Sequence, residues 1–371
     1  MDCDVLIVGA GIAGASIAAN IAGAVSTMVI EAEDFAGFHS TGRSAAFYDE
    51  SYGGPGVQPL TSASGPMLAQ GQRDMDGRSF LRPRGGVILA HGDNIGALAA
   101  MQAQFAGTQV ALTPMDGAEL HRRVPGLRAA WANALRQPHC QDIDVGALHQ
   151  SMLKRAKMGG ATQVNRAALV RATRLAGGGW RVETEAGIIH AARIVNAAGA
   201  WADDVAARCG AAPIGITPYR RTVVQLRLHQ PVPAELPLCI DAGGSFYVKG
   251  EGEGRVWLSP HDETPDTARD VAAEEQDVAI AIDRLGQVVD WDVAAVERKW
   301  AGLRSFAPDR LPVYGYDAHC PDFFWCAGQG GFGIQTAPAA GLLAGAALLG
   351  HAPDAAVGAI DFARYAPHRF G

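Results

Sequence analysis

Residues 4–14 read Asp-Val-Leu-Ile-Val-Gly-Ala-Gly-Ile-Ala-Gly, an apolar run that leads into a GxGxxG turn. Each glycine of such a turn has a physical reason. Gly9 permits the tight bend, Gly11 lets the backbone approach a pyrophosphate, and Gly14 lets the following helix pack closely on the strand. The free N–H groups and the dipole at the helix N-terminus then favour negative charge. The stretch predicts a phosphate site between a strand and a helix.

An acidic residue follows at the expected place. The next apolar run, residues 28–30, ends at Glu31, close to the spacing of about 20 residues for an acid that binds ribose hydroxyls. Strand, turn, helix, second strand and acid together predict a dinucleotide-binding unit. The alternative is a glycine turn in an ordinary βα unit. The motif alone leaves NAD and FAD both open.

Composition indicates a soluble globular protein of two domains. The chain has 371 residues, more than one hydrophobic core ordinarily holds, so we expect two domains. Its residues are 48% apolar and 19% charged, which is typical of a globular protein. The net charge is −7, and no basic stretch carries interleaved aromatics, so we expect no nucleic-acid partner. The apolar run 337–349 is shorter than the ~20 residues of a membrane span and contains Pro338, so we expect a buried helix.

The cysteines and the N-terminus indicate a cytoplasmic protein. The six cysteines form no CxxC pair and no zinc spacing, which predicts reduced, buried thiols and no metal site. Residues 5–8 are too short for a signal peptide and follow no basic region.

Periodicity and turn signals place the elements. Asp144 is a candidate N-cap, and Gly177 to Gly179 joins two strands as a hairpin. We expect helices over residues 62–75, 115–124, 145–156, 266–281 and 334–349. We expect strands over residues 86–90, 169–175, 180–184, 188–192, 193–197, 218–227, 244–248, 255–259 and 322–327. The last strand and helix return to the nucleotide-binding domain, which is therefore discontinuous.

Four further segments resemble a known family. They are residues 39–46 (HSTGRSAA), 196–201 (NAAGAW), 300–306 (WAGLRSF) and 329–336 (QGGFGIQT). In this order they resemble the D-amino-acid oxidase superfamily of FAD enzymes, and within it the bacterial FAD-dependent D-arginine dehydrogenases. The resemblance implies noncovalent FAD and oxidation of an amine carbon next to a carboxylate.

The fold class that follows is α/β plus α+β. We expect a Rossmann-like FAD-binding domain of residues 1–75, 142–217 and 298–371. A mostly antiparallel β substrate domain, flanked by helices, is inserted as residues 76–141 and 218–297.

The resemblance also implies cofactor-binding positions. They are the turn residues Gly9, Gly11, Ile12, Ala13 and Gly14; the ribose acid Glu31 and Ala32; Thr41, Gly42, Arg43, Ser44, Ala45 and Ala46 along the flavin ring; Ala168 at the adenine; Ala198, Gly199, Trp201 and Gly302 along the wall; and Gly331, Phe332, Gly333, Ile334, Gln335 and Thr336 at the pyrimidine edge.

For the substrate, the resemblance implies two guanidiniums, Arg221 and Arg304, that hold the carboxylate. A guanidinium fork suits a carboxylate because it donates two parallel, charge-assisted hydrogen bonds. Arg304 stands in an apolar segment, where an arginine needs an anion. Arg220 beside Arg221 leaves the register open at that strand.

Four more active-site positions follow from the same resemblance. They are the tyrosines Tyr52 and Tyr247, the carbonyl of Gly331 near the amine, and the side chain of Gln335. Both tyrosines could instead be core aromatics. His39 is expected to be structural rather than a base.

Two positions depart from the D-arginine dehydrogenases. Gly85 replaces an acid that pairs with a cationic substrate, and Phe47 replaces a histidine. We therefore expect a neutral or apolar substrate. Arg84 leaves an acidic substrate open, although we expect its side chain to face solvent.

The leading hypothesis is an FAD-dependent D-amino-acid dehydrogenase or oxidase. A hydride passes from Cα to flavin N5, and the imino acid hydrolyses to a 2-oxo acid and ammonia. A glycine- or sarcosine-type amine oxidase or a 2-hydroxy acid dehydrogenase is the second reading, and a non-catalytic FAD-binding scaffold the third. The electron acceptor, whether quinone, dye or oxygen, stays open, as do oligomeric state and the choice between oxidase and dehydrogenase.

Overall fold

The opening unit is present as predicted. The structure is a computed structural model that describes residues 2–70, 77–233 and 235–370. In it β1 (Asp2–Val8) runs into the glycine turn, α1 (Ile12–Ile21) and β2 (Thr27–Ile30). β1 and β2 pair in parallel, so this is a βαβ unit that begins a larger sheet.

The first sheet has eight strands and a parallel centre. Its order is β10-β11-β12-β1-β2-β9, and β20 pairs with β12 and with β19. The members besides β1 and β2 are β9 (Thr162–Val164), β10 (Leu169–Arg174), β11 (Trp180–Thr184), β12 (Gly187–Asn196), β19 (Val313–Tyr316) and β20 (Phe323–Ala327). β12 is one strand where the sequence predicted two, because the residues that pair with β11, 187–191, overlap those that pair with β1, 190–196.

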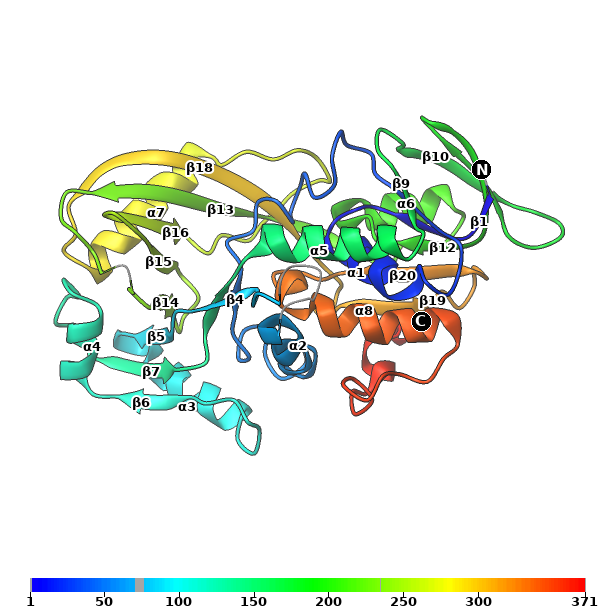
Figure 1. Ribbon diagram of the computed structural model, residues 1–371. Helices are drawn as coiled ribbons and strands as arrows, with labels where there is room; N and C mark the ends of the chain where they lie inside the picture. The colour runs from blue at the N-terminus through cyan, green and yellow to red at the C-terminus, as the bar shows by residue number, and fades with distance from the viewer. Residues whose placement is uncertain (1, 71–76, 234, 371) are drawn as a thin grey trace.

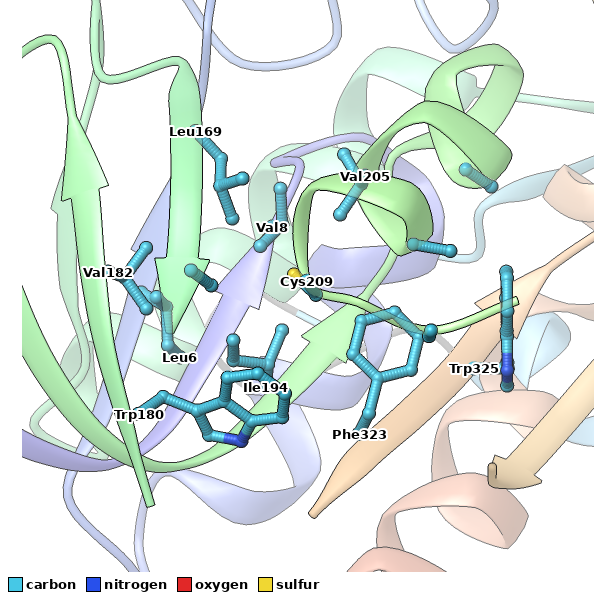
Figure 2. Packing of buried hydrophobic residues seen from close by; sticks show 14 of the residues in the cluster. Leu6, Val8, Leu169, Trp180, Val182, Ile194, Val205, Cys209, Phe323 and Trp325 are labelled. Atoms are coloured by element: carbon cyan, nitrogen blue, oxygen red, sulfur yellow. The ribbon is translucent and has the colours of Figure 1, made fainter. Parts of the chain in front are cut away.

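Helices cover both faces of this sheet, so its central strands are apolar on both sides. Leu6 and Val8 point into one core with Trp180, Ile194 and Trp325, as Figure 2 shows. The alternate residues of β1 point into the opposite core, against α1 and α8. The covering helices are α2 (Gln58–Gln70), α5 (Val145–Met158), α6 (Ala202–Arg208) and α8 (Gly333–Leu349).

The second sheet has nine strands and lies in the other lobe of the molecule (Figure 1). Its order is β17-β13-β16-β15-β14-β5-β7-β6, with β18 on β13, and only the β14–β5 pair is parallel among those described. The strands are β5 (Gly86–Ala90), β6 (Thr113–Met115), β7 (Asn133–Gln137), β13 (Thr217–Leu228), β14 (Leu238–Asp241), β15 (Tyr247–Gly252), β16 (Arg255–Ser259), β17 (Thr264–Pro265) and β18 (Val293–Phe306).

Short elements complete the two lobes. α3 (Ile95–Gln104), α4 (Gly117–Arg123) and α7 (Glu275–Val288) flank the second sheet. A three-stranded sheet of β3 (Phe47–Tyr48), β8 (Gln141–Ile143) and β4 (Leu81–Pro83) has the order β3-β8-β4. The 3-10 turns are η2 (Gly92–Asn94), η3 (Gly199–Trp201), η4 (Phe362–Tyr365) and η5 (Pro367–Phe370). The predicted fold class, a Rossmann-like unit with a mostly antiparallel second sheet, is confirmed. The predicted domain boundaries stay a prediction.

Several element predictions need correction. The helix expected from Asp266 begins only at Glu275, because the backbone N–H of Asp266 donates to Pro218 O at 3.0 Å and keeps this segment along the sheet edge. The helix expected over 62–75 begins at Gln58, and residues 71–75 lie outside the described part. Pro338 lies in the second turn of α8. The N-cap prediction is confirmed, since the Asp144 carboxylate accepts from Ala147 N at 3.0 Å.

Three further features concern the cysteines, metal ligation and membrane spanning. All six cysteines are free thiols, and five of them are buried. No cluster of metal-ligating side chains occurs in the part of the chain that the structure describes. Among the same residues, no helix combines the length and the apolar character needed to cross a membrane.

Candidate active site

A cavity of about 420 Å³ runs along the carboxyl ends of the first sheet and reaches the second. Glu31 lines one end, the glycine turn the middle, and Arg221 and Arg304 the other end. A crevice at this edge of an open α/β sheet is where such folds bind nucleotides. The cavity therefore joins the predicted cofactor site to the predicted substrate site.

The glycine turn is shaped as a cradle. Gly9 has φ +104°, and a Cβ there would lie 2.5 Å from Ala197 O. A Cβ at Gly14 would lie 2.0 Å from Gly9 O, so only glycine allows this helix to approach the strand. At Gly11 a Cβ would meet only Thr41 Oγ1, at 3.3 Å, which leaves the space beside the turn open for a phosphate.

Glu31 closes the adenosine end of the cavity. Its Oε2 accepts from Ala10 N at 2.9 Å and its Oε1 from Glu33 N at 3.2 Å. Each carboxylate oxygen keeps a lone pair for a ribose hydroxyl. Beneath the turn, His149 Nε2 lies 2.8 Å from Ala10 O, and burial lowers the pKa of this histidine.

The segment 39–46 lines the middle of the cavity. Thr41 Oγ1 accepts from Ile12 N at 3.0 Å and so joins the segment to the start of α1. Arg43 donates to Val271 O and Ala301 O at 3.0 and 3.2 Å, so its guanidinium ties the two lobes together. His39 pairs with Glu33 at 2.7 Å, which agrees with a structural role.

Eighteen predicted cofactor positions lie on the wall of the large cavity. They are Gly9, Gly11, Ile12, Ala13, Glu31, Ala32, Thr41, Arg43, Ser44, Ala45, Ala168, Ala198, Gly199, Trp201, Gly302, Gly331, Gly333 and Ile334. Ala46 and Gln335 line a second, smaller cavity. Gly14, Gly42, Phe332 and Thr336, although described, line neither; Gly14 and Gly42 instead permit close backbone approaches.

The second cavity, of about 30 Å³, adjoins the large one and holds roughly two water molecules. The two cavities share Ser44, Ala45, Tyr247, Arg304, Gly331 and Ile334. Phe47, Tyr52 and Gln335 close the small cavity on its far side. A ligand that spans the junction would place a small group among these side chains.

Arg221 and Arg304 come from neighbouring antiparallel strands, β13 and β18, at the junction of the cavities. Arg221 is 4% exposed; its Nε donates to Asp262 O at 2.8 Å and one terminal nitrogen reaches Glu263 at 3.2 Å. Its other terminal nitrogen is buried and has no hydrogen-bond partner among the described residues. Burial, and then repulsion by Arg304, lower the pKa of Arg221 to about 10.

Arg220 points to the opposite side of its strand, as alternation requires. Its guanidinium pairs with Glu274, the N-cap of α7, and, at 3.1 Å, with Asp277 in the first turn of that helix. Arg221 is therefore the arginine of this pair that faces the cavity.

Two tyrosines and a histidine surround Arg304. Arg304 donates to the Tyr52 hydroxyl at 2.7 Å, and Tyr247 is buried with a pKa that burial raises. His261 lies beside both, with ring centroids 6.4 Å from Tyr52 and 5.9 Å from Tyr247. His261 could not be predicted from the sequence, because it follows a strand of the second sheet with no motif around it.

Gln335 acts on the backbone rather than on the open cavity. Its Oε1 accepts from Asp49 N at 3.1 Å, and its amide nitrogen donates to Tyr52 O and Thr61 Oγ1 at 3.2 and 3.1 Å. The contacts with Asp49 and Tyr52 fix the segment that carries Tyr52, and the contact with Thr61 joins it to α2. Gln335 is thus placed to position Tyr52.

The two sequence departures lie in different surroundings. Phe47 lines the small cavity, whereas Gly85 lines neither, and a Cβ at Gly85 would meet nothing within 4 Å. The expectation that Arg84 faces solvent is wrong. Arg84 donates to Asp142 at 2.7 Å and to Leu236 O at 3.0 Å, so it is not free for an acidic substrate.

Comparison with known proteins identifies the family. The chain belongs to the FAD dependent oxidoreductases (DAO), whose family model matches residues 4–347. FAD is therefore its cofactor, and the open cradle at Gly11 and the cavity that extends from it to Arg304 fit that group. The narrower resemblance to D-arginine dehydrogenases stays a prediction.

Similar sequences include two curated proteins. The chain is 27% identical over 237 residues to hydrogen cyanide synthase subunit HcnC of Pseudomonas aeruginosa, which covers 62% of this chain and 54% of that protein. It is 30% identical over 166 residues to the bifunctional protein ThiO/ThiG of Nostoc sp., which covers 42% of this chain and 23% of that protein. The chain thus aligns with about half of the first relative's length and about a quarter of the second's.

Solved structures share the whole fold. Glycine oxidase from Geobacillus kaustophilus superposes with a TM-score of 0.84 at 22% identity, covering 98% of both chains. L-proline dehydrogenase from P. horikoshii gives 0.84 at 22% identity, covering 100% of this chain and 98% of that one. L-alpha-glycerophosphate oxidase from Mycoplasma pneumoniae, solved with FAD bound, gives 0.84 at 14% identity, covering 94% and 95%. At these identities the likeness establishes the fold.

Proposed function

We propose that this protein oxidises a small, neutral D-amino acid to its imino acid, which water converts to a 2-oxo acid and ammonia. The observation that supports this most is the pair of cavity-facing guanidiniums, Arg221 and Arg304, at the junction of the two cavities. One terminal nitrogen of Arg221 is buried without a partner, an arrangement that a carboxylate would complete. FAD, bound noncovalently in the large cavity, supplies the hydride acceptor.

The protein's own residues bind and orient. The two guanidiniums fix the carboxylate, and Gly331 lies so close to Arg304 that a Cβ there would be 2.9 Å from its terminal nitrogen. The carbonyl of Gly331 and the hydroxyl of Tyr52 are the acceptors proposed for the amine. With the carboxylate and the amine both held, the Cα–H has one orientation, which is catalysis by positioning.

The size of the small cavity supports a small side chain. About 30 Å³ beside Phe47 and Tyr247 suits a methyl group or slightly more, and every side chain that lines it other than Arg304 is uncharged. A cationic side chain would meet no anion there. The D configuration rests on the resemblance of the four sequence segments, so the test must include both enantiomers.

The test is anaerobic reduction of the purified flavoprotein. We expect D-alanine or a similar small D-amino acid to bleach the flavin absorbance, and we expect L-alanine, D-arginine and D-glutamate to act far more slowly. The proposal is wrong if no D-amino acid reduces the bound flavin while L-enantiomers or 2-hydroxy acids do. Full flavin occupancy with no reduction by any candidate would instead support a non-catalytic FAD scaffold.

A glycine- or sarcosine-type amine oxidase is the second candidate. The small cavity favours it, since glycine has no side chain to accommodate. It differs in outcome: glycine and sarcosine would then reduce the flavin faster than D-alanine does.

A further inference from the structure

His261 presents an unprotonated nitrogen to the active site. Its Nδ1 lies 2.8 Å from Gly244 O. A carbonyl oxygen only accepts, so Nδ1 carries the ring hydrogen and Nε2 of the neutral ring is an acceptor. Nε2 lies 3.5 Å from the hydroxyl oxygen of Tyr52, at the outer limit of a hydrogen bond.

The Tyr52 hydroxyl has one hydrogen and two lone pairs to distribute. Arg304 cannot accept a hydrogen bond, so its contact at 2.7 Å uses one lone pair. The hydrogen of the hydroxyl then needs an acceptor, and Nε2 of His261 is one within reach. The second lone pair is left for the small cavity, which Tyr52 lines.

We propose that His261 is a positioning residue. Its Nε2 accepts a hydrogen bond from the Tyr52 hydroxyl, so that Tyr52 presents an oxygen lone pair to the amine of the substrate. This inference rests on the proposed function. It makes Tyr52 an acceptor for the amine rather than a donor to the carboxylate.

The surroundings of His261 keep its ring neutral. Burial, and then the charges of Arg221 and Arg304, lower its pKa to about 3. Arg284, on α7, donates to Ser245 O at 2.6 Å and also to Pro260 O, beside the histidine. These cations surround the ring together with the two tyrosines.

The carboxylate next to His261 is already engaged elsewhere. Asp262 accepts from Thr222 N and Thr222 Oγ1 at 2.8 and 3.0 Å. It therefore does not hold a proton on the ring.

Backbone conformation and hydrogen bonds hold His261 in one position. Its φ is +55°, a conformation that an L-residue adopts at a cost and that the surrounding structure must maintain. The backbone N–H of His261 donates to Ser259 Oγ at 3.1 Å. Together with the bond to Gly244 O, this fixes both the ring plane and the tautomer.

A consequence concerns the protonation state of the bound amine. Arg221 and Arg304, which line the large cavity, repel an ammonium group, and two acceptors, Tyr52 and the Gly331 carbonyl, suit the N–H groups of a neutral amine. kcat/KM should rise with pH until the free substrate's amine is deprotonated. It should show no inflection from His261 between pH 5 and 8.

The test compares His261→Gln with His261→Phe in the FAD-loaded enzyme. Glutamine keeps an acceptor within reach of Tyr52, whereas phenylalanine keeps the ring shape without one. We expect kcat/KM for D-alanine to fall about tenfold or more in H261F and to stay within about threefold in H261Q. Acetate, which has no amine, should perturb the flavin spectrum with unchanged affinity in both variants.

A second measurement does not depend on turnover. In the wild-type holoenzyme labelled with ¹⁵N-histidine, the His261 signals, found by their loss in H261Q, should report the Nδ1–H tautomer from pH 5 to 8. An Nε2–H tautomer or an imidazolium at pH 7 would overturn the inference. Equal kinetic losses in both variants, with an active wild type, would also overturn it, whereas a wild type inert to every amino acid would overturn the proposed function.

Discussion

Each side chain at the candidate substrate site already has a partner that limits what it can do. Arg304 donates to Tyr52, and Arg221 holds Asp262 O and Glu263, so only part of each guanidinium is left for a ligand. What remains is a short arc of donors at the cavity junction. A carboxylate fits that arc because it accepts at several positions at once.

Replacing Arg304 with lysine tests the carboxylate clamp. Lysine keeps a charge but loses the planar fork and the bond to Tyr52. We expect kcat/KM for D-alanine to fall about 100-fold, mostly through KM, because charge-assisted hydrogen bonds to the carboxylate are lost. Steady-state kinetics of the holoenzyme measure this. The control is Arg227→Lys. Arg227 lies on β13, is partly exposed and pairs with Glu297, so this substitution should leave kcat/KM unchanged.

Replacing Phe47 tests whether the small cavity receives the substrate side chain. Phe47 is 7% exposed and lines that cavity, so Phe47→Ala should enlarge it. We expect kcat/KM for D-leucine relative to D-alanine to rise at least about tenfold, with a loss of roughly 3 kcal/mol in unfolding free energy. Phe47→Leu, a smaller change, should lose about 1 kcal/mol. An unchanged substrate ratio in the alanine variant would place the side chain elsewhere.

At this scale the sequence predicted Arg304 and Arg221 but could not predict His261. Arg304 stood out because an arginine in an apolar strand needs an anion. His261 reaches the site only because the loop after β16 folds back toward Tyr52, 209 positions away in the chain. A contact of that kind has no local signal. The prediction that Arg84 faces solvent was wrong for the same reason, since its partner Asp142 comes from a distant strand.

At the level of elements, the turn between β1 and α1 decides whether FAD binds. Its three glycines are glycine for different reasons. A Cβ at Gly9 or Gly14 would clash with the backbone of the protein itself. A Cβ at Gly11 would meet only Thr41 Oγ1 and would otherwise extend into the large cavity.

Two alanine substitutions in this turn should therefore separate folding from cofactor binding. Gly14→Ala places a Cβ 2.0 Å from Gly9 O and should lower the unfolding free energy by about 2 kcal/mol or more. Gly11→Ala meets only Thr41 Oγ1, so stability without FAD should change by less than about 1 kcal/mol. Its FAD affinity should fall at least about tenfold, because the methyl group occupies the pyrophosphate space.

Denaturant unfolding of FAD-free protein and a fluorescence titration with FAD provide the two readouts. FAD binding by Gly11→Ala as tight as that of the wild type would contradict the role of Gly11 in leaving space for the pyrophosphate.

Elements with local signals were predicted well. α5 begins after its Asp144 cap, and the glycine run joins β10 to β11 in a hairpin. The helix expected from Asp266 was wrong, because its first residues are held at the edge of β13 by contacts that the sequence does not reveal. Tertiary hydrogen bonds outweighed helix propensity there.

At the level of the whole molecule, two long strands connect the cofactor site to the substrate site. β13 and β18 pair along nearly their full length, from Thr217–Phe306 to Leu228–Val293. Their ends near Phe306 border the large cavity, and their far ends belong to the second sheet in the other lobe (Figure 1). The discontinuous order of these strands in the chain was predictable, but their register, which places Arg221 opposite Gly302, was not.

This construction stores an unfavourable charge in the free enzyme. The protein carries a net charge of −7, yet two guanidiniums lie together at the base of the cavity. Because burial and the charge of Arg304 lower the pKa of Arg221 from its ordinary value to about 10 in the folded state, the unfolded chain binds its proton more tightly. Below pH 10 the charged Arg221 therefore costs the folded state roughly 3 kcal/mol, and this penalty shrinks as pH rises above 10.

Replacing Arg221 with methionine should reveal that penalty. Glu263 keeps its partner Arg310 at 2.9 Å, and the Asp262 carboxylate, which loses the Arg221 charge 3.9 Å away, keeps its two hydrogen bonds from Thr222. The substitution strands the backbone carbonyl of Asp262, which costs about 1 kcal/mol. At pH 8 we expect the ligand-free variant to be as stable as the wild type, or up to about 2 kcal/mol more stable, while kcat/KM for D-alanine falls at least about 100-fold. Acetate should raise the Tm of the wild type but not that of the variant, because binding relieves the repulsion only where Arg221 is present. A variant that is clearly less stable than the wild type at pH 8 would show that Arg221 is held for structure, and the carboxylate clamp would then rest on Arg304 alone.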